Sequence, residues 1–302
     1  MDSHPATTAP SSAPRAGIRL PGVGVGLGRG MVVLYLSLMV MLPLAAVVDE
    51  SLSGGLDAFW DSVTGAQSLA ALKLTVICSL IVVAINAVFG TVIAWVLVRD
   101  DFPGKSAINA LIDLPFALPT IVAGLTLLTL YGAESPFGLD IAFTRVAIVV
   151  ALCFITLPFV VRAVQPLLME MDREMEEAAT SLGAGGFTVF RRIIFPNLMP
   201  GIIAGILLAF ARALGEYGSL ILISGNIPFE TEVSSVFIRT QIETGNVSGA
   251  SAVSVVLLAI SLALLIGVSL FARSGRHGEN KGILTRAIGR VIGRSQVSGD
   301  RI

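Results

Sequence analysis

Long apolar stretches separated by short polar segments dominate the chain. A helix needs about 20 apolar residues to cross a hydrocarbon core about 30 Å thick. Six stretches reach or approach that length, at residues 30–48, 72–98, 107–131, 146–169, 197–224 and 250–272. The pattern therefore predicts an all-α integral membrane protein with six transmembrane helices.

Composition supports this fold class. Apolar residues make up 54% of the 302-residue chain and charged residues only 14%, against about 25% charged residues in a soluble domain. Both cysteines, Cys78 and Cys153, fall inside apolar stretches, and the sequence contains neither a C-x-x-C motif nor a histidine cluster. We therefore expect no disulfide framework and no metal site.

The polar segments divide the chain into regions. Residues 1–29 are rich in Pro, Ser, Thr and Ala and then in Gly, which predicts a disordered tail. Because this tail is long for the start of a cleaved signal, we interpret residues 30–71 as a retained transmembrane helix followed by an extracytoplasmic loop. Residues 72–272 hold the other five helices and a polar loop at 170–196, and residues 273–302 form a basic tail.

The distribution of Lys and Arg predicts the topology, because basic residues favour cytoplasmic loops. Sixteen basic residues fall on one side of the six stretches when Arg162 is counted with the loop that follows the fourth stretch. The other side has only Lys73, Arg145 and Arg239. We therefore expect both termini, and the 170–196 loop, to lie in the cytoplasm.

The 170–196 loop contains helix-forming residues. Residues 172–182 predict a short helix with four acidic residues in its opening turns, where the helix dipole favours negative charge. Gly183 is a candidate for the residue that ends this helix, and a second helical segment is expected at 187–194. Ala178 and Ala179 are expected to be exposed and small enough for another surface to approach closely. From the residues alone, a helix lying on lipid headgroups is equally consistent.

A spacing pattern within this loop resembles the cytoplasmic signature of permease subunits of bacterial ABC importers. The matching residues are Glu177-Ala178-Ala179, Gly183, Ile193 and Phe195-Pro196, with Phe195 in place of the usual Leu. In that family this short coupling helix docks into a cleft on the ATP-hydrolysing subunit. The resemblance thus implies that Glu177, Ala178, Ala179 and Gly183 couple the chain to an ATPase, and that residues 72–272 are an ABC-importer type permease core.

The chain has no sequence motif for hydrolysing ATP itself. Its only Gly-Lys-Ser, at 104–106, has Arg99 where the phosphate-binding loop requires its first Gly. Neither G-x-S-x-G nor H-E-x-x-H occurs, which argues against a membrane hydrolase or metalloprotease. We expect a transporter subunit that is not an enzyme and carries no cofactor, with ATP and Mg used by a separate ATPase.

Four further segments are similar to the sulfate/thiosulfate permeases, and specifically to the first of the two non-identical permease chains in that system. They are "VRDDFPGK" (98–105), "DLPFALPTIVAG" (113–124), "LPFVVRAVQP" (157–166) and "GEYGSLILISGNIP" (215–228). The resemblance covers residues 30–272. It implies binding-protein-dependent import of sulfate or thiosulfate by a multi-pass protein of the bacterial cytoplasmic membrane.

The same resemblance implies a set of partners. These are two copies of an ATP-binding subunit, a second permease chain that completes a heterodimer, and an extracytoplasmic sulfate-binding protein. No nucleic-acid partner is expected. A permease for molybdate or another oxyanion remains open, as does an ion-coupled secondary transporter.

Three ionisable residues within the apolar stretches indicate function, because charges inside a membrane are costly. They are Asp113, Arg212 and Glu216, and together they carry a net charge of −1. Arg212 and Glu216 are four residues apart on one predicted helix and can pair. Two interpretations of this pair remain open: its two charges only neutralise each other, or the pair also lines a translocation path. Asp113 likewise either lines the path or is a solvated carboxylate at the end of a helix.

Helix-breaking residues occur close to these charges. Pro115 and Pro119 interrupt the third stretch, and Gly215 and Gly218 flank Glu216 in the fifth. Breaks inside a bilayer require neighbouring protein or a water-filled cavity to satisfy the freed backbone groups. The third and fifth helices are therefore candidates for lining the path, with kinked packing alone as the alternative. Small residues recur at every fourth position of the fifth stretch and predict a helix-packing seam: Gly201, Gly205, Ala209 and Ala213.

Overall fold

The computed structural model describes residues 23–267 and residue 270. All regular secondary structure in this part of the chain is helical. The chain up to Ala46 and the chain from Val47 form two separate units. Helix α1 begins at Val23, inside the range 1–29 where disorder was expected. Residues 1–22 and the basic tail at 273–302 lie outside the described residues.

The first unit holds α1 (Val23–Leu36), the π-helix η1 (Ser37–Met41) and the start of α2 (Leu42–Ser51). From Gly28 to Ser51 these elements form one helical run of 24 residues that is long and apolar enough to cross a membrane. It corresponds to the first transmembrane helix expected at 30–48.

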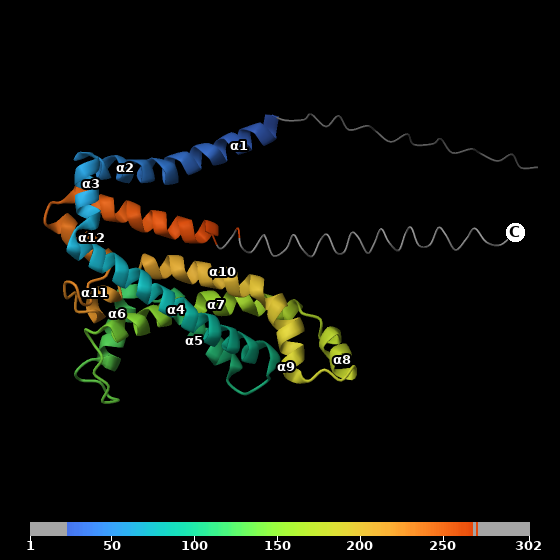
Figure 1. Ribbon diagram of the computed structural model, residues 1–302. Helices are drawn as coiled ribbons and strands as arrows, with labels where there is room; N and C mark the ends of the chain where they lie inside the picture. The colour runs from blue at the N-terminus through green and yellow to red at the C-terminus, as the bar shows by residue number, and fades with distance from the viewer. Residues whose placement is uncertain (1–22, 268–269, 271–302) are drawn as a thin grey trace, which may run out of the picture. The chain divides into compact units, whose positions relative to one another are not determined.

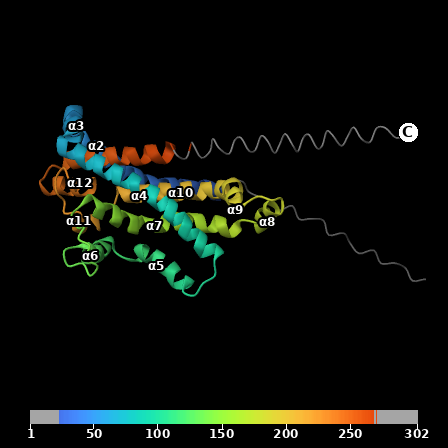
Figure 2. The same cartoon turned by 60° about the horizontal axis from the view of Figure 1, so that its bottom comes forward.

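The second unit contains the remaining helices. Three long ones lie side by side, with α8 at one end and α11 and α12 at the other (Figures 1 and 2). In chain order the elements are α3 (Gly55–Thr64), α4 (Ala66–Arg99), α5 (Lys105–Ala117), α6 (Thr120–Tyr131), α7 (Arg145–Glu170), α8 (Arg173–Ser181), α9 (Gly186–Val189), η2 (Phe190–Ile194), α10 (Phe195–Leu214), α11 (Leu220–Ile223), α12 (Ser234–Glu243) and a last helix at Val247–Gly267. The three long neighbours are α4, α7 and α10.

The described residues include five helices that could each cross a membrane, and six candidates when the bent pair α5–α6 is counted as one. The protein is therefore an all-α, multi-pass membrane protein. The fifth prediction, 197–224, was wrong in its extent, because the helix runs from Gly186 to Leu214. The segment expected at 187–194 is not separate but joins α10 through η2. This π-helical turn precedes Pro196, and such turns let a helix adjust around a residue that cannot donate a backbone hydrogen bond.

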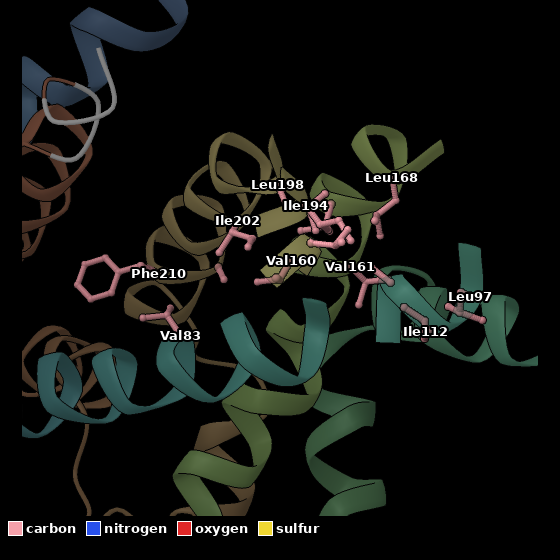
Figure 3. Close-up of a cluster of buried hydrophobic side chains, with 14 of the residues drawn as sticks. Val83, Leu97, Ile112, Val160, Val161, Leu168, Ile194, Leu198, Ile202 and Phe210 are labelled. Carbon is pink, nitrogen blue, oxygen red and sulfur yellow. The ribbon is translucent and has the colours of Figure 1, made fainter. Parts of the chain in front are cut away.

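The core of the second unit lies between α4, α7 and α10 (Figure 3). Val160 and Leu198 are fully enclosed there. The seam predicted along α10 is confirmed: a Cβ added at Gly205 would lie 2.7 Å from the Cα of Val160, and one at Gly201 would lie 2.7 Å from the carbonyl oxygen of Ala163. Glycine at these positions lets the two helix backbones approach more closely than any side chain would permit.

Buried polar side chains connect the long helices. The Asn86 side chain on α4 donates to the Thr156 hydroxyl on α7 at 2.9 Å and to the Cys153 carbonyl oxygen at 3.2 Å. The backbone N–H of Ser234 in α12 donates to the Thr75 hydroxyl on α4 at 2.8 Å. Interhelical hydrogen bonds of this kind contribute on the order of 0.6 kcal/mol each in a membrane, and they also fix the register of the helices.

Candidate functional site

The third apolar stretch is broken where its prolines predicted. Helix α5 contains Pro115 and ends at Ala117, and Pro119 is the residue immediately before α6. The axes of the two helices are bent by 116°. Proline removes a backbone donor and disfavours the helical conformation of the residue before it. The helix continues through Pro115, and the break falls at Leu118, directly before Pro119, where the backbone is extended.

The helix in the fifth apolar stretch ends beside a buried carboxylate. Helix α10 stops at Leu214, and Glu216, which is 1% exposed, lies just beyond it. The backbone N–H and the hydroxyl of Ser219 donate to Glu216 Oε1 at 2.9 and 3.0 Å. Arg212 Nη1 lies 2.6 Å from Oε2, as an ion pair rather than an aligned hydrogen bond. The predicted Arg212–Glu216 pair is confirmed, and the buried carboxylate holds the chain as it bends away from α10.

The two breaks pack directly against each other. A Cβ added at Gly218 would lie 2.2 Å from the Thr120 hydroxyl oxygen, and one added at Gly124 would lie 2.6 Å from the Ser219 carbonyl oxygen. The start of α6 therefore lies against the bend that follows α10. These glycines are needed because there is no room for a side chain between the two backbones.

A second ion pair, which is only partly buried, was not predicted from the sequence. Arg162 was counted with a cytoplasmic loop in the sequence analysis, but it lies inside α7. Its guanidinium donates two hydrogen bonds to the carboxylate of Asp113 on α5. Its Nε donates to Oδ1 at 2.7 Å and its Nη2 to Oδ2 at 2.5 Å. The net charge of −1 expected among the embedded residues is therefore corrected to zero, because Arg162 balances Asp113 as Arg212 balances Glu216. The Asp113 side chain remains 48% exposed.

The remaining Arg162 donors also find acceptors. Nη1 donates to the Gln165 side-chain oxygen at 2.5 Å, and Nη2 to the Asn109 carbonyl oxygen at 3.0 Å. These residues and Lys105 line a cavity of about 290 Å³ between the α4 end, α5 and α7. All five N–H groups of the Arg162 guanidinium are therefore bonded to protein acceptors, and the arginine joins α5 to α7 rather than presenting free donors to the cavity.

Helix α8 lies where the short loop helix was expected. The Asp172 side chain accepts from the Glu174 backbone N–H at 2.9 Å and so caps the helix start. At the other end Gly183 has a φ of +86°. Its N–H bonds to the Thr180 carbonyl oxygen, and the next N–H bonds to that of Ala179, as in the glycine-terminated helix motif.

The exposed face of α8 differs in one residue from the prediction. Glu177 and Ala178 are exposed, but Ala179 is only partly exposed because it packs against the hydrophobic core. Leu182 and Phe187, on either side of the Gly183 turn, are 90% and 76% exposed. Two such apolar side chains beside an acidic helix indicate a surface that contacts another protein. The helical periodicity of α8 did not predict this surface, because both side chains lie outside α8.

Known proteins match most of the chain. Residues 86–276 match the family described as "Binding-protein-dependent transport system inner membrane component". The chain is 46% identical over 249 residues to the sulfate transport system permease protein CysT of Synechocystis, covering 80% of this chain and 87% of the relative. It is 41% identical over 247 residues to CysT of Escherichia coli K12, covering 79% and 89%.

A solved structure shares the fold. A chain of a bacterial alginate ABC transporter, crystallised with its periplasmic protein bound to an alginate pentasaccharide, superimposes with a TM-score of 0.70. The match covers 82% of this chain and 93% of that chain at 16% identity. This match shows the shared fold, and the sequence matches show that the chain belongs to the binding-protein-dependent transport inner membrane family, in the group of sulfate transport system permeases.

Proposed function

We propose that the chain is the membrane-spanning permease subunit of an ATP-driven importer for sulfate or thiosulfate. The observation that carries this proposal is the similarity of 41–46% identity to sulfate transport permeases over about four fifths of the chain. Two of the four segments that resemble sulfate permeases form the paired breaks. "DLPFALPTIVAG" spans the break between α5 and α6, and "GEYGSLILISGNIP" begins with the bend after α10.

The proposal includes an arrangement of partners. An ATP-binding subunit, present in two copies, contacts the α8 end through Glu177, Ala178, Ala179 and the Gly183 turn, and uses ATP and Mg that this chain does not bind. A second permease chain completes a heterodimer, and an extracytoplasmic sulfate-binding protein delivers substrate at the opposite end. Both termini are then cytoplasmic. The exposed Leu182 and Phe187 support a protein partner at α8 rather than water.

The translocation path, in this proposal, follows the two packed breaks and includes Asp113, Pro115, Pro119, Arg212 and Glu216. Arg212 is 34% exposed while its partner Glu216 is enclosed. The enclosed carboxylate thus orients the guanidinium, and the donors that face outward are available to a passing anion. A site with so few donors is weak, which suits an importer whose binding protein supplies the affinity.

A molybdate permease is the alternative within the same family. An ion-coupled transporter is a different alternative, and it is disfavoured by the ion pairs: Asp113 and Glu216 each have an arginine partner. The experiment that separates these functions is uptake of labelled sulfate in a strain lacking its own sulfate permease. We expect thiosulfate to compete strongly and molybdate weakly, and uptake to stop when the ATPase is inactivated with the ion gradient intact. Uptake that survives ATPase inactivation would reject the proposal.

A further inference from the structure

Arg99, the last residue of α4, lies at a junction of several elements. Its side chain is 11% exposed and forms an ion pair with Glu176 of α8. Its Nη2 also points at the Met171 sulfur, 3.7 Å away, at the end of α7. The guanidinium stacks over the Trp95 ring one turn earlier on α4, 5.3 Å from the ring centroid, where cation–π attraction adds to its binding.

The Trp95 ring extends this junction toward α10. It meets the Phe190 ring edge to face, with centroids 6.2 Å apart, and Phe190 in turn packs against Phe195 at 6.0 Å. Phe190 is the first residue of the π-helical turn η2, which leads directly into α10. A continuous series of side-chain contacts therefore joins α8, the end of α4 and the start of α10.

Few other contacts hold α8 to the rest of the molecule. None of its residues is buried. In the part of the chain that the structure describes, the Arg99–Glu176 pair is the only side-chain hydrogen bond or ion pair that joins α8 to another helix. Arg99 Nε is buried without an acceptor, so the guanidinium depends strongly on Glu176. The two side chains are 11% and 21% exposed, so removal of Glu176 leaves the Arg99 charge largely enclosed and uncompensated, which is unfavourable.

We propose that Arg99 is a positioning residue that connects α8 mechanically to α4 and, through Trp95 and Phe190, to α10. A displacement of α8 then moves the start of α10, whose far end holds Arg212 and the bend at Glu216. This inference rests on the proposed role of α8 as the contact for the ATPase. Arg99 touches neither substrate nor nucleotide, so its removal should uncouple hydrolysis from transport rather than abolish either site.

The test uses the complete complex in proteoliposomes, with the ATPase, the second permease chain and the sulfate-loaded binding protein. Sulfate imported and ATP hydrolysed are measured in the same vesicles. For Arg99→Gln we expect the complex to assemble, and the sulfate-to-ATP ratio to fall about tenfold, which is within the usual range of coupling between sites. Glu176→Gln should lower the ratio in the same direction.

Two further variants distinguish coupling from general damage. The exchange Arg99→Glu with Glu176→Arg restores the ion pair and should recover part of the ratio. Asp101→Asn breaks an ion pair with Lys105 in which the aspartate is fully exposed, and it should leave the ratio unchanged. If Arg99→Gln does not assemble, Glu176→Gln and Trp95→Leu are measured instead, since Trp95→Leu keeps the ion pair but removes both ring contacts.

A wild-type ratio in an assembled Arg99→Gln complex, or in both Glu176→Gln and Trp95→Leu, would overturn the inference. A cysteine at Ala178 provides the separate check on the proposed function. If it captures the ATPase by cross-linking while the ratio stays normal, only the Arg99 inference fails. If it captures no ATPase in the wild-type background, the role of α8 itself is wrong.

Discussion

The two arginine–carboxylate pairs of the embedded region differ in how they are built. Arg212 and Glu216 lie four residues apart at the end of one helix, and the carboxylate is 1% exposed. Arg162 and Asp113 lie on two helices, and the carboxylate is 48% exposed. The first pair shapes a bend within one segment, whereas the second joins α5 to α7 and leaves its carboxylate accessible.

This difference predicts unequal consequences when a pair is broken. The Glu216 carboxylate is enclosed by protein, so no water can stabilise its charge when Arg212 is lost. The loss of the arginine therefore leaves a buried, uncompensated charge. In the proposed path, water reaches the half-exposed Asp113 carboxylate, so we expect it to lose less when its partner or its own charge is removed. We therefore expect the stability of the protein to depend more on the Arg212–Glu216 pair than on the Arg162–Asp113 pair, although the first pair involves only one helix.

The largest effect is expected for Arg212→Gln. Leaving Glu216 unpaired should destabilise the subunit by about 3 kcal/mol and abolish sulfate uptake, as measured by thermal unfolding of the purified complex and by labelled uptake. The double variant Arg212→Gln/Glu216→Gln removes both charges and should regain stability. Uptake should stay lost in the double variant if Arg212 contacts the anion. Its recovery there would show that the pair only neutralises itself.

Gly218→Ala should have the next largest effect, because the new Cβ would meet the Thr120 hydroxyl at 2.2 Å. Overpacking of this kind costs about 2 kcal/mol, and it would push apart the two breaks that hold Arg212 in place. Gly185→Ala is the matched control, since a Cβ there meets no atom within 4 Å. Equal unfolding temperatures for the two variants would contradict the close packing of α6 on this bend.

Glu216→Gln should be milder than Arg212→Gln. The amide oxygen can still accept from Ser219, so the bend is retained, while Arg212 loses the charge that orients it. We expect a loss of about 1 kcal/mol, normal assembly with the partner chains and clearly reduced uptake. Normal uptake by this variant would remove Glu216 from the path.

Asp113→Asn should have the smallest effect on stability, below about 1 kcal/mol. The amide keeps one acceptor for Arg162, and half of the side chain is already exposed. The comparison between the two pairs fails if Asp113→Asn lowers the unfolding temperature as much as Arg212→Gln does.

Local patterns in the sequence predicted the features that are local in the structure. The Arg212–Glu216 pair followed from a four-residue spacing, the break at Pro115 and Pro119 from proline chemistry, and the α10 seam from the spacing of small residues. The Arg162–Asp113 pair joins residues 49 apart in sequence, and no local pattern specifies which helices will be neighbours.

The end of the fifth helix shows the limit of hydropathy. Residues 215–224 continue the apolar composition, so composition alone extended the helix through them. The structure stops the helix at Leu214, because Gly215 and Gly218 allow a bend and the Glu216 carboxylate binds the N–H and hydroxyl of Ser219. Likewise, the full exposure of Ala179 was predicted from its place in a polar loop, but packing against the hydrophobic core covers part of that side chain.

The most direct test of the account is sulfate import into proteoliposomes that contain this chain, its second permease chain and the ATP-binding subunit. With sulfate-loaded binding protein outside and ATP inside, we predict accumulation of labelled sulfate against its gradient, and none when the ATP-binding subunit carries an inactive nucleotide site. Accumulation driven by a proton or sodium gradient without ATP, or ATP hydrolysis that moves no sulfate in the wild-type complex, would contradict it.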